Sequence, residues 1–470
     1  MSINHTKILA TLGPATSSLE KVCALIEAGA NVFRINFSHG SHEEHAQRIA
    51  WVREAGEKLN KPVGVLMDLQ GPKFRVGTFQ NGPVNLVNGA KFTLDMDPTP
   101  GDETRVCFPH PEAIGSLGVG SEVFLDDGNL RLVITEAADD HVVTEVVVGG
   151  ELGERKGVNM PGNLGKVNPL TEKDMIDMEF GLSQNVDWVA LSFVQTPADV
   201  IAAKEKIAGR ATLVAKIEKP SAVEQFEEIV KVTDAVMVAR GDLGVEMPAH
   251  QVPGLQKMMI KLCRQYAKPV IVATQMLESM RDKPRPTRAE VSDVANAVYE
   301  GADAVMLSAE TASGDFPVEA VTMMTDIIRE VESDPLYYQV LDTTEPAYEP
   351  TVESAISLAL QSTTHLLDIS AIINYTSSGF STLQASRERP AAPILSLSHS
   401  PETARRLSLV WGVYPLYSEK FELQSEMVDF ALAKAVEAGF SKSGDKTVIT
   451  AGVPFGVPGT TNMLRIETVK

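Results

Sequence analysis

The chain has 470 residues, a length that suits two or three domains with large cores. Its 44% hydrophobic content and mean hydropathy of −0.02 exclude an intrinsically disordered protein. The 62 acidic and 42 basic residues give a formal net charge of −20, which argues against nucleic acid or an anionic membrane surface as a partner.

Signals for secretion, membrane insertion or disulfide bonding are not found. The N-terminal stretch MSINHTKILATLGP has only a very short apolar run and lacks the h-region of a signal peptide. No apolar run approaches the ~18 residues that a transmembrane helix needs. Cys23, Cys107 and Cys263 lie far apart without a CxxC pair, so neither a disulfide framework nor a thiolate zinc site is indicated. We therefore expect a cytoplasmic protein.

Apolar runs alternate with amphipathic helical runs along the first 340 residues, as in a parallel sheet built from βα units. The strand candidates are KILATLG, NVFRINFS, VGVLMDLQ, DWVALSFV, TLVAKIE, AVMVARG, PVIVATQM and AVMLSAE. Eight such units close naturally into a TIM barrel, whose active site lies at the C-terminal ends of the strands.

The third βα unit is interrupted after MDLQGPKFR. No helical pattern follows for about a hundred residues. Instead VNLVNGAKFTLDM, SEVFLDDGNLRLVI and HVVTEVVVGG alternate like half-buried antiparallel strands, with NG and DG turn signals between them. We expect an inserted β domain on the catalytic face, either a water-excluding lid or a passive decoration.

A Pro-, Thr- and acid-rich connector follows the eighth helix, and a further α/β alternation then predicts a separate domain with an open sheet. The fold class is therefore α/β, with three domains. The predicted ranges are 1–70 and 168–340 for the barrel, 71–167 for the lid and 341–470 for the C-terminal domain.

Charged and polar side chains follow most of the strand candidates. Side chains two apart on a strand point the same way, so Lys216 with Glu218, and Arg240 with Asp242, can each present a pair to one site. A cation and a carboxylate from adjacent strand ends suggest a metal held beside an anion. The other strand ends carry Arg34, Asn36, Ser38, Asp68, Gln70, Thr274, Ser308 and Glu310.

The motifs NFSHG, MDLQGPKFR, KIEKP, MVARGDLG, ATQMLESMRDKPRPTRAEVSDVANAV and MLSAETASGDFP together closely resemble the pyruvate kinase family. The resemblance covers essentially the whole chain. It implies a barrel, an inserted lid and a C-terminal effector domain, in a cytoplasmic, usually homotetrameric and allosteric glycolytic enzyme. It further implies Mg²⁺-dependent (or Mn²⁺-dependent) transfer of the phosphoryl group of phosphoenolpyruvate to ADP, giving pyruvate and ATP.

The resemblance also implies roles for single residues. Glu218 and Asp242 look like the Mg²⁺ ligands, since magnesium takes few carboxylates and shares its octahedral positions with substrate and water. Lys216 and Arg34 would bind the transferring phosphoryl group as cations. The expected contacts to the substrate carboxylate are backbone amides at Gly241 and Asp242, and those on the nucleotide side are His39, Arg75 and Lys156.

Protonation of enolpyruvate is expected at Thr274, with Ser308 and Glu310 in a nearby hydroxyl and water network. Threonine alone is a poor acid at neutral pH, so a relay with water as proton source is expected. The alternative is that Thr274 only binds the substrate carboxylate.

The sequence departs from the family at the monovalent-cation site. Many members hold K⁺ at positions matching Asn36, Ser38, Asp68 and the backbone of Leu69, and carry Glu where this chain has Lys73. A lysine ammonium supplies fixed positive charge or repels K⁺. We therefore predict that K⁺ is not required, unless Lys73 points to solvent.

The C-terminal stretch NYTSSGFST follows a predicted strand and opens a helix, so its amides and hydroxyls suit a phosphate. The resemblance places an effector loop for a sugar phosphate or nucleotide there, formed by Thr376, Ser377, Ser378, Gly379 and Ser381. Phe380 stands where a basic or small polar residue is frequent, and VPFGVPGTTN carries no Lys or Arg. These departures argue against activation by fructose 1,6-bisphosphate and leave two alternatives, a monophosphate effector or no effector.

Two other functions are compatible with the same barrel fold. One is a Mg²⁺-dependent lyase that breaks or forms C–C bonds through enolpyruvate, which would need neither Lys216 nor a nucleotide-side lid. The other is an inactive metabolite-binding regulator, for which loss of Lys216, Glu218, Asp242 or Thr274 is expected. All four are present.

Overall fold

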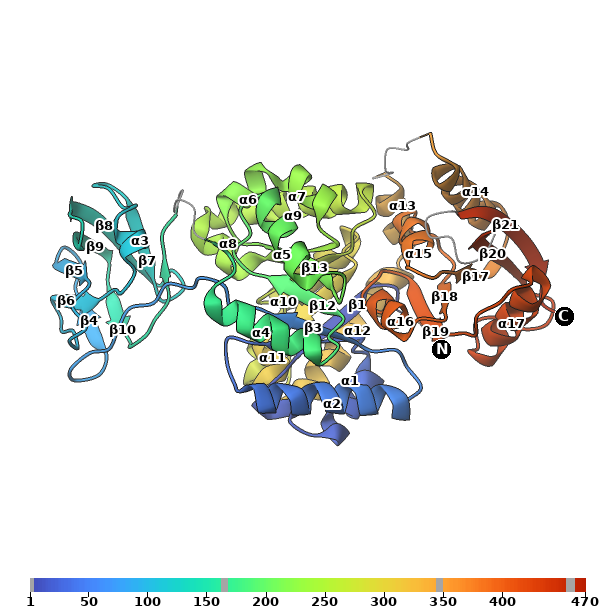
Figure 1. The fold of residues 1–470 in the computed structure, drawn as a ribbon, viewed down its shortest axis with the longest axis horizontal. Helices are drawn as coiled ribbons and strands as arrows, with labels where there is room; N and C mark the ends of the chain where they lie inside the picture. Colours follow the sequence, from blue (N-terminus) through green and yellow to red (C-terminus); the bar gives the residue numbers. More distant parts are fainter. Residues whose placement is uncertain (1–3, 162–167, 344–349, 454–460) are drawn as a thin grey trace.

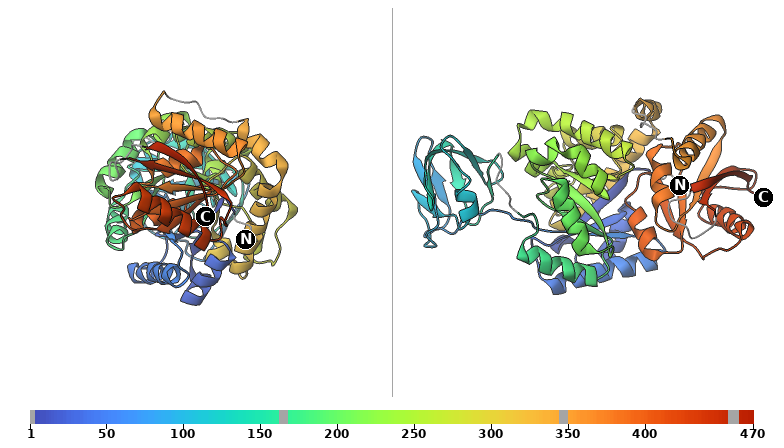
Figure 2. Two further views of the ribbon diagram at one scale, coloured as in Figure 1. Left: turned by 90° about the vertical axis from the view of Figure 1, so that its right-hand side faces the viewer. Right: turned by 45° about the horizontal axis from the view of Figure 1, so that its top comes forward.

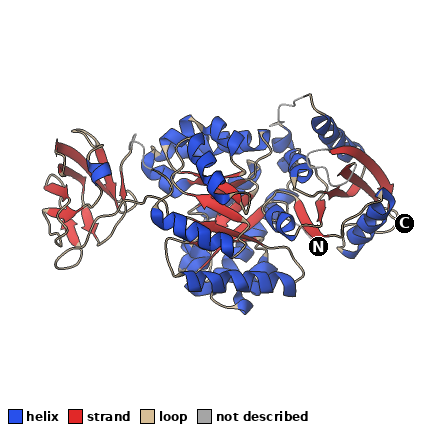
Figure 3. Cartoon of the chain, in the orientation of Figure 1, coloured by secondary structure: helices blue, strands red, loops and turns tan. Residues whose placement is uncertain are grey.

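The computed structural model describes residues 4–161, 168–343, 350–453 and 461–470. Three bodies follow one another along the longest axis: a small β domain, a barrel and an open-sheet α/β domain (Figure 1). Figure 3 shows that strands dominate the first body, while helices enclose the sheets of the other two. The α/β fold class expected from the sequence is confirmed.

Eight parallel strands form a closed barrel in the order β1-β16-β15-β14-β13-β12-β3-β2. All eight strand candidates of the sequence are confirmed. Their bounds are Lys7–Leu12 (β1), Val32–Asn36 (β2), Gly64–Asp68 (β3), Trp188–Leu191 (β12), Thr212–Ile217 (β13), Ala235–Ala239 (β14), Val270–Ala273 (β15) and Ala304–Leu307 (β16). The inward side chains fill the barrel with a core that includes Leu66, Val214, Met237 and Ile271.

Helices surround the barrel and bury a larger apolar layer against the strands. Several begin at a Ser or Thr N-cap in a capping box, among them Ser41, Thr171 and Thr287. The stretch SAVEQFEEIVKV forms two short helices rather than one. The bounds are Leu19–Ala28 (α1), His42–Lys58 (α2), Glu172–Ser183 (α4), Pro197–Ile207 (α5), Pro220–Glu224 (α6), Phe226–Val232 (α7), Arg240–Glu246 (α8), Val252–Gln265 (α9), Arg288–Tyr299 (α10), Ala309–Ala312 (α11), Pro317–Ser333 (α12) and Pro335–Asp342 (α13), with 3-10 turns at Pro14–Thr16 (η1), Ala249–Gln251 (η2) and Glu278–Arg281 (η3).

The inserted domain, called the lid here, has its own apolar core and a six-stranded sheet in the order β11-β7-β8-β9-β5-β6. Its elements are Val84–Leu86 (β4), Lys91–Asp95 (β5), Arg105–Cys107 (β6), Pro111–Ile114 (α3), Glu122–Leu125 (β7), Leu130–Ala137 (β8), His141–Val148 (β9), Gly150–Leu152 (β10) and Val158–Asn159 (β11). The stretch therefore contains one short helix, α3, that the sequence pattern did not indicate.

One lid turn behaves as expected and another does not. The Asp127–Gly128 turn joins the antiparallel pair β7 and β8. The Asn88–Gly89 turn lies between β4 and β5, but these strands do not form a hairpin, because β4 pairs with β10 instead. Asn88 explains the difference: its side-chain oxygen accepts the Gly149 N–H at 2.6 Å and so holds the β10 end beside β4.

The C-terminal domain is an open sheet in the order β19-β18-β17-β20-β21, parallel except for β21. Helices pack on both sides, as expected for this alternation. The elements are Val352–Leu366 (α14), Ile369–Tyr375 (β17), Phe380–Arg387 (α15), Ile394–Ser398 (β18), Pro401–Leu407 (α16), Val413–Tyr417 (β19), Gln424–Glu437 (α17), Lys446–Gly452 (β20) and Thr461–Thr468 (β21).

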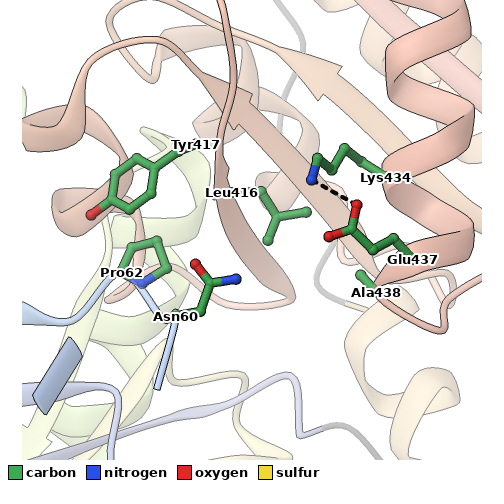
Figure 4. Close-up of a pocket in the computed structure, with 7 residues that line it drawn as sticks. All are labelled: Asn60, Pro62, Leu416, Tyr417, Lys434, Glu437 and Ala438. Atoms are coloured by element: carbon green, nitrogen blue, oxygen red, sulfur yellow. Dashed lines mark hydrogen bonds and ion pairs between the residues drawn. The ribbon is translucent and has the colours of Figure 1, made fainter. Parts of the chain in front are cut away.

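The C-terminal domain packs on the barrel at the end away from the lid (Figure 2). Buried ion pairs cross this contact: Arg405 Nε lies 2.8 Å from Asp187 Oδ1, and Arg389 Nη2 lies 3.0 Å from Asp303 Oδ2. A cavity remains between the domains, lined by Pro62 of the barrel and by residues of β19 and α17 (Figure 4). The C-terminal domain therefore leaves the barrel mouth that faces the lid to the functional site.

In the part of the chain that the structure describes, no helix combines the length and the apolar character needed to cross a membrane. Cys23, Cys107 and Cys263 are all buried free thiols.

Candidate active site

The barrel mouth that faces the lid holds a polar cavity. Most of the residues that the sequence marked at strand ends line it. The whole lining comes from the ends of β2, β3, β12 and β13, the first turn of α8 and the start of the lid. The lining residues are Arg34, Asn36, Ser38, His39, Asp68, Leu69, Gln70, Lys73, Arg75, Ser192, Phe193, Lys216, Glu218 and Asp242. The structure therefore brings the residues expected for phosphate, metal and monovalent cation into one place, together with His39 and Arg75 of the nucleotide side.

Lys216 is the centre of the charge network in this cavity. Its ammonium lies 2.9 Å from Glu218 Oε1 and 3.1 Å from Asp68 Oδ1, and it donates to Ser192 Oγ at 2.7 Å. Only 11% of the Lys216 side chain is exposed, so Lys216 and Glu218 do not form a solvated surface ion pair. Since Lys216 and Glu218 are two residues apart, their shared direction is as expected for a strand end.

Burial and opposite charges act against each other on these groups. Burial disfavours the charged form of Lys216, but the carboxylates of Asp68 and Glu218 outweigh it and hold the pKa of the ammonium above its ordinary value. Burial likewise opposes ionisation of Asp68, but Lys216 and Arg34 keep the pKa of that carboxyl below its ordinary range. Burial raises the pKa of Glu218, and the negative charge of Asp242 adds to this effect.

Arg34 extends the positive side of the cavity. Its Nε lies 2.6 Å from Asp68 Oδ2, and its Nη1 donates to Thr11 Oγ1 at 3.3 Å. Asp68 thus holds both Arg34 and Lys216 from the floor of the site. The remaining guanidinium N–H groups of Arg34 have the fork geometry that suits phosphate oxygens.

The donor set of the cavity fits a Mg²⁺ or Mn²⁺ ion. Glu218 and Asp242 offer carboxylate oxygens from the end of β13 and the first turn of α8. Among the described residues no group of three or more His, Cys, Asp and Glu side chains is arranged to hold a metal. Two carboxylates with open positions for substrate and water match magnesium, which rarely occupies an all-protein cage.

Thr274 lies directly after β15 in an unusual backbone conformation. Its φ of 72° and the φ of 54° at Gln275 are both left-handed, which is rare for a β-branched residue. The Thr274 hydroxyl donates to Ala273 O at 2.6 Å and accepts the Gly241 N–H at 2.7 Å. In this conformation the Gly241 amide, expected at the substrate carboxylate, is therefore bound to Thr274.

Arg240 does not share a site with Asp242, and that expectation was wrong. The strand β14 ends at Ala239, so Arg240 and Asp242 belong to α8, where the two-residue alternation does not apply. The Arg240 guanidinium turns away from the charged cavity and donates to Thr274 O at 2.7 Å and to Asp293 Oδ1 at 2.6 Å.

Ser308 and Glu310 lie at the end of β16 and the start of α11. The Glu310 carboxylate is fully buried and accepts the backbone N–H groups of Ser308 at 2.7 Å and Leu277 at 3.2 Å. Burial raises the pKa of Glu310 despite these bonds. Leu277 belongs to the segment that follows Thr274, so Glu310 fixes that segment through the backbone.

The residues expected on the nucleotide side divide into two groups. His39 and Arg75 line the charged cavity, and partial burial with the charge of Arg75 lowers the pKa of His39. Lys156 is not among the lining residues and instead pairs with Asp126 at 2.7 Å. Arg75 Nη1 donates to Arg155 O at 2.9 Å, which joins the cavity to the lid segment between β10 and β11 that carries Lys156.

The residues of the expected monovalent-cation site also line the cavity. Asn36 Oδ1 accepts the Ser38 N–H at 3.1 Å, and Leu69 O accepts the Ser192 hydroxyl at 2.7 Å. The Lys73 side chain is 30% exposed, and its ammonium lies 4.0 Å from Asp127 Oδ1 of the lid. Lys73 thus lies between the cavity and the lid rather than in open solvent.

Ser192 and Phe193 are site residues that the sequence interpretation missed. Ser192 contacts Lys216, and the Phe193 N–H donates to Glu218 Oε2 at 2.9 Å. The signal was available, because both residues lie near the end of the run DWVALSFV, one of the eight strand candidates.

The expected effector loop follows β17 and precedes α15, as the sequence indicated. Thr376 Oγ1 accepts the Gly379 N–H at 2.9 Å, and Gly379 has a φ of 90°. Ser381 Oγ donates to Asn374 Oδ1 at 3.0 Å, while Ser378 is exposed. Most of the late loop VPFGVPGTTN, residues 454–460, lies outside the described residues.

Comparison with known proteins identifies the family. A family model for "Pyruvate kinase, barrel domain" matches residues 3–321, and one for "Pyruvate kinase, alpha/beta domain" matches residues 353–467. The chain belongs to the pyruvate kinase family. It is therefore an enzyme, a phosphotransferase, and the resemblance noted from the motifs is confirmed.

Curated pyruvate kinases match over nearly the full chain. The pyruvate kinase of Methylorubrum extorquens is 50% identical over 465 residues, which cover 99% of this chain and 97% of the relative. One from Agrobacterium vitis is 45% identical over 466 residues, covering 99% and 98%. That of Geobacillus stearothermophilus is 42% identical over 470 residues, covering 99% of this chain and 80% of the relative.

Proposed function

We propose that the chain transfers the phosphoryl group of phosphoenolpyruvate to ADP, giving pyruvate and ATP, with Mg²⁺ as cofactor and without a requirement for K⁺. One observation carries this proposal: the single cavity in which Arg34 and Lys216 face the carboxylates Glu218 and Asp242. Membership of the pyruvate kinase family supports the same reaction.

Phosphoryl transfer asks the protein to position two anions and to stabilise charge on the migrating group. Arg34 and Lys216 provide that charge, and Asp68 orients both of them. Because Lys216 is buried, its interaction with a bound phosphoryl oxygen is screened less than at a surface. A Mg²⁺ ion held by Glu218 and Asp242 would neutralise further negative charge on the substrate oxygens.

The nucleotide side of the cavity opens toward the lid. His39 and Arg75 supply the nearest positive charge and hydrogen-bond donors. Lys156 is paired with Asp126 in this structure, so in our scheme it reaches the nucleotide side when that pair breaks and the lid moves closer. Lid closure would exclude water, which otherwise competes with ADP for the phosphoryl group.

Protonation of enolpyruvate is assigned to Thr274, which is bonded to Gly241 at the start of the helix that carries Asp242. The hydroxyl is fixed by Ala273 O and the Gly241 N–H, so its position is defined. Glu310 and Ser308 hold the adjoining segment, and water is the proton source in this scheme.

Lys73 supports independence from K⁺. It lines the cavity beside Asn36, Ser38 and Asp68, where a fixed ammonium replaces the charge of a bound monovalent cation. Asp127, the nearest carboxylate to its ammonium, is exposed and 4.0 Å away, so this contact is weak and leaves Lys73 free to reach the cavity.

The deciding experiment is an assay of pyruvate formation from phosphoenolpyruvate and ADP, coupled to NADH oxidation, in tetramethylammonium buffer. We expect turnover with Mg²⁺, loss of turnover with a chelator, and little response to added K⁺. Strong stimulation by K⁺ would contradict the role of Lys73. Absence of ADP-dependent turnover, with C–C cleavage of a 2-oxo acid instead, would favour the lyase.

Three broader expectations remain proposals. The domain ranges 1–70 with 168–340, 71–167 and 341–470 are testable by limited proteolysis. A homotetramer is testable by light scattering. An effector at Thr376–Ser381 is testable by phosphoenolpyruvate saturation curves with candidate sugar phosphates and nucleotides.

A further inference from the structure

Three buried side chains meet where the lid returns to the barrel, and we call them the hinge triad: Asn159, Lys219 and Glu246. Lys219 Nζ lies 2.6 Å from Glu246 Oε1, and Asn159 Nδ2 donates to the same oxygen at 3.0 Å. Their exposed fractions are 7%, 5% and 4%. Each comes from a different element, so the triad ties together three parts of the chain that are distant in sequence.

We propose that the hinge triad couples the position of the lid to the carboxylates Glu218 and Asp242, so that Asn159 and Glu246 act as positioning residues for the divalent cation. This inference rests on the proposed metal role of those two carboxylates. Asn159 and Glu246 are not metal ligands or substrate contacts in this proposal.

The covalent paths from the triad to the cavity are short. Lys219 directly follows Glu218. Glu246 and Asp242 are four residues apart on α8, so their side chains lie on the same face of one helix. Like charges in that arrangement repel, and the Lys219 ammonium offsets the repulsion from the Glu246 end. A displacement of Glu246 therefore moves the helix that carries Asp242.

A second route runs through Phe193. Lys219 Nζ lies 5.3 Å from the centre of the Phe193 ring, and the Phe193 N–H donates to Glu218 Oε2. Phe193 has a left-handed φ of 58°, so its conformation depends on these neighbours. Movement of Lys219 thus reaches Glu218 both through the chain and through Phe193.

Asn159 connects the hinge triad to the lid. Asn159 belongs to β11, which pairs with β7, and the turn after β7 holds Asp126, the partner of Lys156. At this turn, a Cβ placed on Gly128 would lie 3.5 Å from Val245 Cγ1 of α8, which is ordinary contact. The lid sheet therefore meets α8 at its C-terminal half through both Asn159 and the β7–β8 turn.

Stability alone is a poor explanation for this arrangement. Both donors converge on Glu246 Oε1, while Glu246 Oε2 is buried with no hydrogen-bond partner among the described residues. A buried carboxylate with an unsatisfied oxygen costs free energy that an apolar side chain would avoid. The triad fixes the positions of the lid, α8 and the end of β13 relative to one another. Its role is therefore to position the site rather than to stabilise the fold.

The test compares Asn159→Ala with Asn88→Ala. Asn88 is the matched control, because it is also a lid asparagine but its side chain accepts a hydrogen bond from Gly149 within the lid. Mn²⁺ is titrated by electron paramagnetic resonance into the substrate-free enzyme. We expect N159A to raise the Mn²⁺ Kd about tenfold, the order given by loss of a hydrogen bond to a buried charged group, and N88A to leave it within about twofold.

Hydrogen–deuterium exchange is the second measurement, because it reports on the triad without metal. N159A is expected to speed exchange of amides in 240–247 and 157–160, and N88A is not. Glu246→Gln, which keeps the side-chain shape, is expected to act in the same direction and serves if N159A proves unstable. The coupling is wrong if both variants match N88A in Mn²⁺ Kd and in exchange at 240–247.

A wrong assignment of the metal ligands can be distinguished from a wrong coupling by the hinge triad. If Asp242→Asn leaves Mn²⁺ binding unchanged, the proposed ligand role of Asp242 is wrong. Hydrogen–deuterium exchange in 240–247 then decides by itself whether Asn159 of the lid holds α8 in place. Faster exchange in N159A supports this coupling, and unchanged exchange overturns it.

Discussion

At the scale of single residues, Thr274 shows how the site departs from relaxed geometry. Thr274 and Gln275 have φ values of 72° and 54°, each of which costs roughly 1–3 kcal/mol for residues other than glycine. Arg240 donates to the carbonyls of Ala273 and Thr274 and so holds this segment in place. The strain places the Thr274 hydroxyl at the Gly241 amide, beside the helix that carries Asp242.

Replacement of Thr274 separates its two possible roles. If Thr274 relays the proton, T274A lowers by about 100-fold both kcat and the exchange of pyruvate methyl protons with D₂O, the order expected for loss of a general acid. The exchange is followed by proton NMR with Mg²⁺ and inorganic phosphate. T274S, which keeps the hydroxyl, is expected to retain most of it. A raised KM for phosphoenolpyruvate with normal exchange would instead make Thr274 a binding residue only.

Lys73 is the residue that we expect to decide the cation requirement. K73E replaces the fixed positive charge beside Asn36 and Asp68 with a carboxylate, as in the K⁺-dependent members that the resemblance implies. Activity in tetramethylammonium buffer is expected to fall at least about tenfold, equivalent to ~1.4 kcal/mol, and to recover when K⁺ is added. Lys58→Glu, at an exposed position of α2, is the control for the charge change and should show neither effect.

At the scale of elements, the lid leaves the barrel through a crowded glycine. Gly71 has a φ of 69°, and a Cβ there would lie 2.6 Å from Phe193 Cδ2 and 3.0 Å from Ser192 Cβ. The Gly71 N–H also donates to Asp174 Oδ1 at 3.1 Å. The lid connection thus packs directly on the residues that contact Lys216 and Glu218.

Gly71→Ala tests this contact. Gly89→Ala is its matched control, because Gly89 has a φ of 81° but nothing within 4 Å of its added Cβ. Both substitutions strain the backbone by about 1 kcal/mol, while only G71A also displaces Ser192 and Phe193. We expect G71A to lower kcat/KM at least about tenfold and G89A to leave it near wild type, the factor corresponding to ~1.4 kcal/mol. Equal activities would show that the lid connection tolerates displacement.

At the scale of the whole molecule, a buried aromatic and charged cluster joins the N-terminus, the barrel and the C-terminal domain. His5 stacks on Trp411 with ring centres 4.6 Å apart, and its backbone N–H donates to Glu332 Oε2 at 2.7 Å. Burial, with smaller contributions from Lys7 and Arg389, lowers the pKa of His5 to about 3. Native His5 is therefore neutral over most of the accessible pH range.

This shift predicts acid lability of the contact between the domains. Below the ordinary histidine pKa of about 6.5 the unfolded chain binds a proton that the native state does not, so stability is lost as pH falls toward 3. The slope from one such group is at most ~1.4 kcal/mol per pH unit. Burial raises the pKa of Glu332 to about 7, so this carboxyl acts in the opposite direction over the same range, in wild type and variant alike. We expect the Tm of His5→Phe, which keeps the ring stack, to gain on that of wild type as pH falls from 7 to 4.5.

The control for this measurement is His365→Asn, at an exposed position near the end of α14. Its Tm is expected to follow wild type at every pH. An H5F profile parallel to that of wild type would assign the acid lability to other groups, such as the paired carboxylates of the interface.

Much of the fold followed from local patterns. Buried parallel strands are continuous apolar runs, and all eight runs became barrel strands because such runs cannot stay solvated. The end of each run then marked the mouth of the barrel, so Lys216, Glu218 and Arg34 were identifiable before any contact was known. Ser192 and Phe193 were at an equally visible strand end but carry less distinctive side chains.

The sequence by itself determined the barrel, the inserted domain, the open sheet and the set of charged residues at one mouth, because these depend on periodicity and on position along the chain. Only the tertiary structure decided the pairing of β4 with β10, the turn of Arg240 toward Thr274 and Asp293, and the meeting of Asn159, Lys219 and Glu246. These contacts join residues distant in sequence, and they depend on strand ends, helix starts and packing that no local pattern encodes.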